Sequence, residues 1–536
     1  MEQVTIQADS IEHLDRYMKR LVPFGFHGQV LVAQNGKILL NEGYGLANRK
    51  QNIPNTAYTA FDTGSINKPF TAIAIMQLIE QGKLSLDTTL QQLYAGIPND
   101  KASITIQHLL SHTSGLENYH MESDFQPMTQ EEALDKIFDL PMIADIGSTY
   151  YYSNAAYGLL AIIIEMLSGQ PYRDYMRDHI FLPANMTQTG WYGERIWNEN
   201  QVATGYVQGE SCGSPYEWDA PQWALLGAGG LVHPVSDLFK AHQALKHNTL
   251  LSAETNQQML DHELAWAVEH DTPHGLLVQH NGASMYGFSA SFRRYIDHDI
   301  VITLAVNVSD GDNALAVDVE NHIVDIVFGK NLALPPTVNP SLNMNYQSGD
   351  FSDGNDGILR FTSNEQLLVS TMSPEATSWF FPLTDASTFH QTMREIAQAI
   401  AEHDLARFKA LFVKPERVPA YQDNLNQYET ELGQLQSTDY LGCSSLRHYT
   451  VAYIRLFFEN GNRMLPLAWE GDTIAGCIPI DEDKASVINS IVYPQTENTL
   501  AGHNLLLGTS FTLTFTENGA ILATDSATIT LSHIEN

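Results

Sequence analysis

A serine and a lysine that stand one helical turn apart are the residues of this 536-residue chain that first suggest chemistry. Ser65 and Lys68 belong to the stretch Phe-Asp-Thr-Gly-Ser-Ile-Asn-Lys-Pro-Phe (61–70), which opens an apolar run that predicts a buried helix. Side chains at i and i+3 share one helix face, so the amine would lie beside the hydroxyl, at the positive end of the helix dipole. We therefore predict that Ser65 is a nucleophile, with a simple helix cap as the alternative.

A tyrosine and an asparagine form the second candidate group. Tyr152-Ser-Asn154 is the one Tyr-x-Asn sequence in the chain, and it follows a turn at Gly147 and leads into an apolar helix predicted over 155–167. Both side chains would lie on the loop that approaches this helix. The alternative is an aromatic cluster with an asparagine that caps the helix.

A histidine and a glycine form the third candidate group. His280-Asn-Gly282 stands where a predicted strand is interrupted by small residues, and a glycine there lets a ligand approach the backbone. The alternative is a hydrogen-bonded structural histidine. His108 and His112 have the i,i+4 spacing of a zinc-binding helix, but no glutamate stands between them as in a metalloprotease helix, so we favour packing or capping and predict no metal site.

The elements that must hold these groups predict an antiparallel sheet combined with helices. Asn35-Gly36 predicts the turn of a hairpin over 28–45, and the apolar run 300–307 predicts another buried strand. Further helices are predicted over 10–22, 105–116 and 313–328. The aromatic and glycine-rich stretch 191–223 suits either a loop region that encloses a substrate or a filled core.

The pattern changes after the proline-rich stretch 334–340, which predicts a linker. We predict a catalytic domain at 1–335, a linker and β segment at 336–385, and a C-terminal domain at 386–536. This last domain would be α+β and strand-rich, with helices first and then a cystatin-like roll or barrel. The length of the chain exceeds one ordinary core and agrees with two or three domains.

Composition narrows the expected partners and location. With 62 acidic against 28 basic residues, the net charge of −34 repels polyanions, so nucleic acids and anionic membrane surfaces are not expected partners. The sequence shows no secretory leader and no membrane span, so we expect a cytoplasmic protein, or a periplasmic or secreted one if a leader was trimmed. Cys212, Cys443 and Cys477 indicate neither a disulfide framework nor a zinc site, although Cys443 and Cys477 could pair.

Residues 24–330 resemble the serine β-lactamase and penicillin-binding-protein superfamily. The resemblance is to its branch of class C β-lactamases, D-alanyl-D-alanine carboxypeptidases, esterases and D-aminopeptidases. It depends on the order of the three groups along the chain and on five further phrases: Gly28–Ala33, Gly43–Asn48, Gln77–Asp87, His108–Leu116 and Gly229–Leu231. The resemblance implies an α+β fold, in which a helical subdomain packs on an antiparallel sheet flanked by helices, with the site in the cleft between them.

The resemblance also implies a role for each candidate residue. Tyr152, held near the Lys68 ammonium, would have a pKa lowered from about 10 and would act with Lys68 as the base that activates Ser65. Asn154 would bind an amide of the acyl side chain, and the N–H groups of Ser65 and Ala283 would form the oxyanion hole beside Gly282. No cofactor is expected.

The third group departs from the Lys-Thr-Gly usual in β-lactamases of this branch, since His280 stands in place of the lysine. An imidazole titrates near pH 6.5, so above about pH 7 it would be a mostly neutral donor and a weak partner for a substrate carboxylate. We therefore predict a serine hydrolase that forms an acyl-enzyme from a small ester, amide or D-amino-acid peptide. The alternatives are a β-lactamase proper and a non-catalytic sensor that binds peptides or muropeptides.

Overall fold

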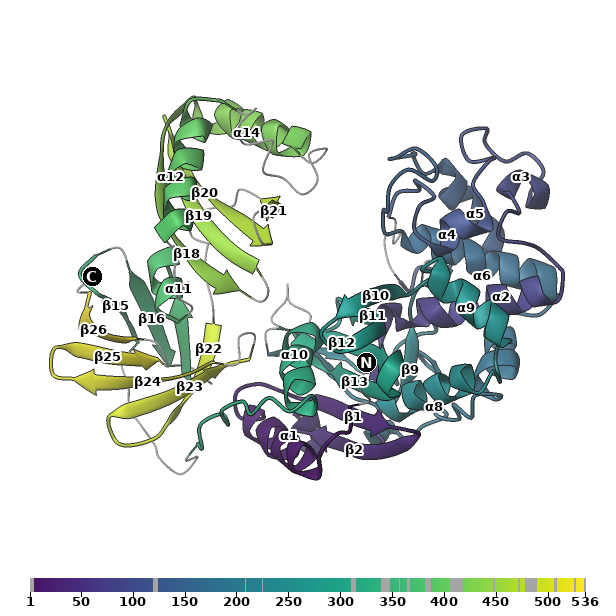
Figure 1. Ribbon diagram of the computed structural model, residues 1–536, viewed down its shortest axis with the longest axis horizontal. Coiled ribbons are helices and arrows are strands. Elements are labelled where there is room, and N and C mark those ends of the chain that lie inside the picture. The colour runs from purple at the N-terminus through teal and green to yellow at the C-terminus, as the bar shows by residue number, and fades with distance from the viewer. Residues whose placement is uncertain are drawn as a thin grey trace. The chain divides into compact units, whose positions relative to one another are not determined.

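The computed structural model describes residues 4–118, 124–207, 209–223, 225–309, 315–338, 348–355, 357–363, 367–380, 387–404, 418–446, 449–470, 473–477, 489–505, 509–524 and 527–534. The chain divides into two compact units (Figure 1). Unit 1 comprises Met1–Val22 and Phe26–Ala333, and unit 2 comprises Pro23–Gly25 and Leu334–Asn536. All residues of the three candidate groups belong to unit 1.

The centre of unit 1 is a six-stranded antiparallel sheet with the strand order β10-β11-β12-β13-β1-β2. Its strands are β1 (Gly28–Gln34), β2 (Lys37–Tyr44), β10 (Ala267–Thr272), β11 (Gly275–Ser284), β12 (Phe288–Tyr295) and β13 (Ile300–Val306). β1 and β13 come from opposite ends of the unit and pair from Gly28 with Val306 to Gln34 with Ile300. The predicted hairpin turn is confirmed, since Asn35 and Gly36 both adopt the positive φ that a tight two-residue turn requires.

Helices cover both faces of this sheet, as two neighbouring arginines of β12 show. Successive residues of a strand point to opposite faces. Arg293 forms an ion pair with Glu320 of α10 (Leu315–Val327), whereas Arg294 donates from Nε to Nδ1 of His242 in α8 (Val235–Lys246). α10 and α8 therefore lie on opposite faces. α1 (Ala8–Leu21) packs beside α10.

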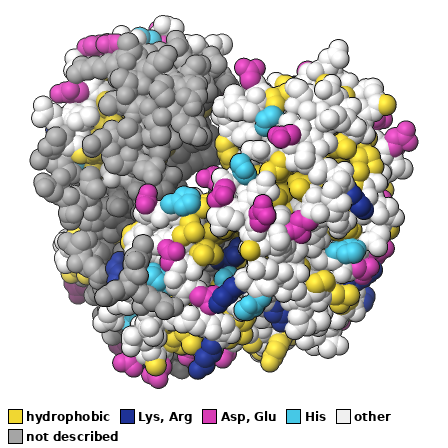
Figure 2. All heavy atoms as spheres, turned by 45° about the vertical axis from the view of Figure 1, so that its right-hand side comes forward, with side chains coloured by type: hydrophobic (Ala, Val, Ile, Leu, Met, Phe, Trp, Pro, Cys, Tyr) yellow, Lys and Arg dark blue, Asp and Glu magenta, His cyan; other side chains and the backbone are white. Residues whose placement is uncertain are grey.

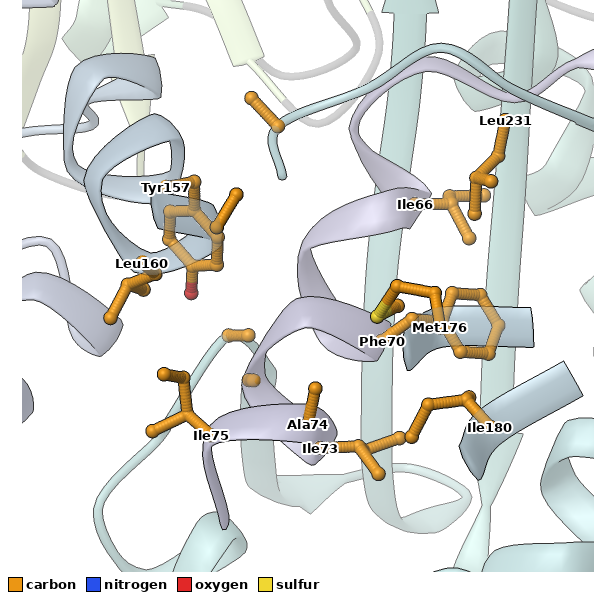
Figure 3. Packing of buried hydrophobic residues seen from close by; sticks show 14 of the residues in the cluster. Ile66, Phe70, Ile73, Ala74, Ile75, Tyr157, Leu160, Met176, Ile180 and Leu231 are labelled. Carbon is orange, nitrogen blue, oxygen red and sulfur yellow. The ribbon is translucent and has the colours of Figure 1, made fainter. Parts of the chain in front are cut away.

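A helical subdomain is built around α2 (Asn67–Glu80), which packs against α6 (Asn154–Ser168). Figure 3 shows apolar side chains around α2: Phe70 points toward Met176, while Ile75 points to the side on which α6 lies. Apolar contacts on opposite sides confirm the buried helix predicted after Ser65. The predicted α+β class, with helices flanking an antiparallel sheet and a helical subdomain, is also confirmed.

Shorter elements complete unit 1. Its remaining helices are α3 (Leu90–Leu93), α4 (Ile106–Leu110), α5 (Gln130–Asp139), α7 (Tyr172–Met176) and α9 (Ala253–Asp261), with single turns at η1 (Gly64–Ile66), η2 (Arg177–Phe181), η3 (Glu199–Gln201) and η4 (Ile296–His298). Its short strands are β3 (Leu46–Asn48), β4 (Ile53–Pro54), β5 (Phe61–Asp62), β6 (Gly190–Trp191), β7 (Gly205–Val207), β8 (Glu210–Gly213), β9 (Leu231–His233) and β14 (Val308–Ser309).

The helix predicted over 105–116 is shorter than expected. α4 ends at Leu110, and His112 adopts a left-handed conformation with φ 57°. An α-helix cannot continue through such a residue. His108 and His112 are therefore not on one helix, and the backbone after α4 turns toward the loop that carries Tyr152.

Unit 2 combines a closed barrel with an inserted α+β layer. The barrel contains β15 (Gly349–Ser352), β16 (Ile358–Ser363), β17 (Leu367–Thr371), β22 (Asn489–Pro494), β23 (Thr499–Asn504), β24 (Thr509–Thr516), β25 (Gly519–Thr524) and β26 (Thr528–His533). Between β17 and β22 the chain forms α11 (Pro374–Phe380), α12 (Ser387–Ala401), α14 (Val418–Leu432), β18 (Leu435–Leu446), β19 (Tyr449–Phe458), β20 (Gly461–Glu470) and β21 (Thr473–Cys477).

The boundary predicted between 385 and 386 falls inside this unit. β17 pairs with β16 on one side and with β22 on the other, and β15 closes the barrel against β26. Barrel strands therefore come from both sides of that boundary, and the helices and sheet between β17 and β22 form an insertion. The division into domains that fold separately stays a prediction.

The cysteine pairing considered from the sequence is wrong, since Cys443 is a free, buried cysteine. In the sheet β18-β19-β20-β21, Cys443 pairs with Ala452, Ala452 with Leu467, and Leu467 with Cys477. Three strand spacings of about 4.8 Å separate the two cysteines, too far for a disulfide.

The surface agrees with the composition. Figure 2 shows the acidic side chains of the described residues scattered over the visible face and not gathered in one patch. Among the helices that the structure describes, none combines the length and the apolar character needed to cross a bilayer.

Candidate active site

The side chains of Ser65, Lys68 and Tyr152 meet in unit 1. Nζ of Lys68 lies 2.9 Å from Oγ of Ser65, and the hydroxyl of Tyr152 donates a hydrogen bond of 2.8 Å to the same Oγ. Ser65 lies in η1, Lys68 in the first turn of α2, and Tyr152 just before α6. Two groups that can move protons therefore contact one serine hydroxyl.

Buried contacts hold the serine turn in place. Gly64 adopts φ 52°, and its N–H donates to the carboxylate of Asp62 at 2.9 Å. Tyr192 donates from its hydroxyl to the other carboxylate oxygen at 2.8 Å. The side-chain amide of Asn67 donates to the carbonyl of Gly229 at 2.8 Å, so the start of α2 is tied to the Gly229–Leu231 phrase.

Burial governs the charge of Lys68. The side chain is fully buried, and Nζ donates to the carbonyl of Ala228 at 2.9 Å. Removal from water disfavours the ammonium and lowers the pKa of Lys68 well below its ordinary value of 10.5. A lysine in this environment can be a neutral amine that accepts a proton.

The prediction that Lys68 lowers the pKa of Tyr152 is wrong. Burial raises the pKa of the Tyr152 phenol above its ordinary value of 10.0, and the hydrogen bond with Ser65 offsets this only in part. The Nζ atom of Lys68 lies 4.7 Å from the centre of the tyrosine ring. Because the ring is desolvated, the phenol keeps its proton and donates it to Ser65 Oγ, and Lys68 is the better proton acceptor.

Backbone of β11 approaches the serine turn closely. Pairing of β10 with β11 ends at Gln279, which leaves the β11 edge from residue 280 onward open to η1. A β-carbon on Gly282 would clash with the carbonyl oxygen of Thr63 and lie 2.9 Å from the nitrogen of Ser65. This close approach, which a side chain at 282 would prevent, brings Ala283 beside the turn that carries Ser65.

His280 is neutral and offers a ring nitrogen that accepts a hydrogen bond, whereas the sequence predicted a hydrogen-bond donor. Its Nδ1 lies 2.7 Å from the carbonyl oxygen of Asn281, which can only accept, so Nδ1 carries the proton. Burial, followed by the charge of Lys68, lowers the pKa of His280 to about 3. The ring is therefore neutral near pH 7, as predicted, and its Nε2 offers a lone pair.

Asn154 stands at the start of α6, beside Asn118. It is the first residue of α6 and is buried, and its side-chain amide donates to Oδ1 of Asn118 at 2.9 Å. Asn154 is absent from the described residues that line the cavity. Contact between this amide and an acyl group stays a prediction.

A cavity of about 970 Å³ opens beside the serine, within the upper part of the range for small-molecule sites. Of the predicted residues it is lined by Ser65, Tyr152, His280, Gly282 and Ala283, and its other walls include His108, His112, Tyr150, Asp261, Glu263 and Trp266. None of the described lining residues is Lys or Arg. Lys68 is fully buried and is not among these lining residues.

The two histidines considered for zinc have other roles. Nδ1 of His108 accepts from the N–H of Thr105 and completes a capping box at the start of α4. The His112 ring stacks on the Tyr152 ring with centroids 4.4 Å apart. The described residues contain no group of three or more His, Cys, Asp or Glu placed to hold a metal. Packing or capping, which the sequence favoured for both histidines, is confirmed, but the stack of His112 on Tyr152 was not predicted because the predicted helix continued through His112.

Comparison with known proteins finds curated relatives that match about half of this chain. The chain is 31% identical over 307 residues to Penicillin-binding protein 4* of Bacillus subtilis (strain 168), covering 51% of this chain and 66% of that protein. It is 26% identical over 321 residues to the teichoic acid D-alanine hydrolase of Staphylococcus aureus (strain MRSA252), covering 59% of this chain and 78% of that protein. The chain spans less than two thirds of the length of two curated penicillin-binding proteins, 62% of one and 66% of the other.

A solved structure resembles the whole chain in fold. The octameric penicillin-binding protein homologue from Pyrococcus abyssi covers 98% of this chain and 100% of its own, with a TM-score of 0.54 and 17% identity. The family model described as Beta-lactamase matches residues 26–323, which is more than half of the chain and includes every residue of the candidate site. With the serine, lysine, tyrosine and histidine groups found together in this matched region, the chain belongs to the Beta-lactamase family, whose members are serine hydrolases.

Proposed function

We propose that this chain cleaves ester or amide bonds through an acyl-enzyme formed on Ser65. One observation carries the proposal: Oγ of Ser65 has Nζ of Lys68 at 2.9 Å and the phenol of Tyr152 at 2.8 Å, in the wall of a cavity. A serine hydroxyl is a weak nucleophile that needs a base in hydrogen-bond reach. The lowered pKa of Lys68 supports this amine as that base.

Acylation would proceed by addition to the carbonyl and then loss of the leaving group. The neutral Lys68 amine takes the Ser65 proton while Oγ attacks the carbonyl carbon, and the carbonyl electrons move to the oxygen. The oxyanion would accept from the N–H groups of Ser65 and Ala283. When the carbonyl re-forms, the bond to the leaving alcohol or amine breaks, and Tyr152 gives that leaving group its proton. The Lys68 ammonium then restores the proton of Tyr152.

Hydrolysis would repeat these steps with water as the nucleophile. Water loses one proton to the neutral Lys68 amine while its oxygen attacks the acyl carbon. The bond from that carbon to Ser65 Oγ then breaks, Oγ takes a proton from Tyr152, and the Lys68 ammonium restores the proton of Tyr152, so the free acid leaves and the site returns to its starting state.

The cavity favours substrates that carry a hydrogen-bond donor or a positive charge. The neutral Nε2 of His280 accepts, and the walls include Asp261 and Glu263 but no Lys or Arg among the described residues. A substrate carboxylate would find no permanent cation there, whereas the free amino group of an aminoacyl ester or amide would be matched. We therefore place D-aminoacyl esters, amides and peptides ahead of penicillins and cephalosporins. The name of the Staphylococcus aureus relative, a teichoic acid D-alanine hydrolase, supports the same class.

The test compares kcat/KM for D-alanine p-nitroanilide, p-nitrophenyl butyrate and nitrocefin. We expect turnover of the first two to exceed that of nitrocefin and to be lost in Ser65→Ala. Nitrocefin turnover above both others would make the protein a β-lactamase proper. Binding of the anilide without turnover of any substrate would instead favour a non-catalytic sensor.

A further inference from the structure

His112 contacts the segment around Tyr152 in three ways. The N–H of Tyr151 donates to the backbone carbonyl of His112 at 2.7 Å, and the N–H of Ser153 donates to its Nδ1 at 3.1 Å. The imidazole and the Tyr152 ring stack with centroids 4.4 Å apart and planes 28° apart. His112 therefore accepts a hydrogen bond from the backbone N–H on each side of Tyr152, and its ring also packs on the Tyr152 ring.

The backbone of His112 is in an uncommon conformation that makes these contacts possible. Its φ of 57° lies in the left-handed region, which residues other than glycine seldom adopt. Such residues persist where surrounding contacts hold them, and they gather at active sites. Here the conformation ends α4 and presents both the carbonyl and Nδ1 of His112 to the tyrosine loop.

The ring of His112 is confined in position and tautomer. The side chain is buried and lines the cavity, and its ring also packs on the Tyr157 ring, with centroids 5.0 Å apart. Because Nδ1 accepts from Ser153, the proton of the neutral ring is on Nε2, an atom that has no hydrogen-bond partner among the described residues. Burial, followed by Lys68 and His280, lowers the pKa of His112, so the ring adds no charge beside the Lys68 amine.

We propose that His112 is a positioning residue that holds the Tyr152 hydroxyl at hydrogen-bond distance from Ser65, through the two backbone hydrogen bonds and the ring stack. The inference rests on the proposed function, in which Tyr152 gives its proton to the leaving group. His112 acts only through Tyr152 and touches none of the reacting atoms. Loss of its contacts would let the phenol move, and a shift of about 1 Å can cost roughly 100-fold in rate.

Two variants separate the contacts. His112→Ala removes the ring and the Nδ1 acceptor, and kcat for p-nitrophenyl butyrate should fall by roughly 100-fold with KM changed less than about threefold. His112→Asn keeps an acceptor at nearly the same place and tolerates the left-handed backbone, so it should recover at least about a tenth of wild-type kcat. The rate at which a fluorophosphonate probe labels Ser65 should follow the same order and needs no natural substrate.

A double-mutant cycle with Tyr152→Phe tests whether His112 acts through the tyrosine. We expect His112→Ala to lower the labelling rate in the wild-type background and to change it less than about twofold in the Tyr152→Phe background, since the group that His112 positions is gone. The same factor in both backgrounds would overturn the proposal and make His112 a general structural residue. If the folded His112→Asn variant labels no faster than the folded His112→Ala variant, the role of the Nδ1 acceptor is overturned.

His274 offers a matched control, because its ring also stacks on an aromatic ring, that of Phe328 at 3.7 Å, and it does not line the cavity. His274→Ala should label at the wild-type rate. Circular dichroism and thermal unfolding would establish that each variant folds. If the probe does not label a folded wild type, both the proposed function and this inference are overturned. If the substitution at position 112 changes the labelling rate by the same factor in the wild-type and in the Tyr152→Phe background, this inference alone is overturned.

Discussion

Lys68 is the residue whose chemistry depends most on its surroundings. A lysine is ordinarily charged, but burial lowers the pKa of Lys68 well below 10.5. Residue type and spacing are sufficient to predict that Ser65, Lys68 and Tyr152 act together, because their types and their order along the chain limit the chemistry. They do not reveal which group is the base, since desolvation is a property of the fold. The sequence therefore assigned the lowered pKa to Tyr152, and the structure assigns it to Lys68.

The pH dependence of kcat/KM should follow Lys68. Protonated Lys68 cannot accept the serine proton, so activity should be present above its lowered pKa and lost as the pH falls through it. His280 cannot produce this loss above about pH 5, since its pKa is lowered to about 3. Initial rates with p-nitrophenyl butyrate from about pH 5 to about pH 9 would give the profile. An acidic limb that disappears in His280→Gln would contradict the assignment to Lys68.

His280 should control the choice between amino-bearing and carboxylate-bearing substrates. His280→Lys replaces a neutral acceptor with a cation, so the ratio of kcat/KM for nitrocefin to that for D-alanine p-nitroanilide should rise by roughly tenfold or more. His280→Gln, which stays neutral, is the matched control and should leave the ratio within about threefold. An unchanged ratio in the lysine variant would show that another part of the cavity recognises the substrate.

At the scale of elements, the close approach of the open β11 edge to η1 brings the backbone N–H groups of Ser65 and Ala283 near each other. Gly282→Ala would place a β-carbon against Thr63 and 2.9 Å from the Ser65 nitrogen, so β11 or η1 must move. We expect kcat for p-nitrophenyl butyrate to fall by about 100-fold with little change in KM, the usual effect of losing an oxyanion donor.

Gly158 of α6 provides the control for that substitution. A β-carbon there meets only ordinary contacts, 3.6 Å from the carbonyl of Trp223 and 3.7 Å from Ile137. Gly158→Ala should keep wild-type kcat and stabilise the helix by about 1 kcal/mol, because alanine has the higher helix propensity. Equal activity of the two alanine variants would show that β11 need not approach Ser65.

Elements with strong local signals could be predicted, and those that depend on distant partners could not. The Asn35-Gly36 turn and the buried helix after Ser65 follow from local residue types. The end of α4 at Leu110 did not, because histidine adopts the left-handed conformation more often than most residues but still too seldom to predict the end of a helix. A roll or barrel was predicted for the C-terminal domain, but not its strands: β17 finds its partner β22 only after an inserted sheet, and an alternating pattern does not specify a partner.

At the scale of the whole molecule, unit 1 should fold without unit 2. A chain that ends at Pro336 keeps the sheet, the helical subdomain and their common core. It should unfold in one cooperative thermal transition, followed by circular dichroism. Aggregation or a non-cooperative transition would show that the boundary is wrong.

One residue complicates that experiment. Phe24 belongs to the short segment grouped with unit 2 and is buried, and its ring centroid lies 5.7 Å from those of both Tyr493 and His503. Truncation would expose it. The matched variant is therefore the truncated chain with Phe24→Ser, which should be at least as soluble as the truncated chain itself because an exposed aromatic side chain is removed.

The central claim is that Ser65 is a nucleophile activated by Lys68 and Tyr152, and intact-mass measurement after reaction with a fluorophosphonate probe tests it most directly. We expect one adduct on the wild-type chain, located on Ser65 by peptide mapping, and none on a folded Ser65→Ala variant. No adduct on the wild type, or an equal adduct on Ser65→Ala, would contradict it.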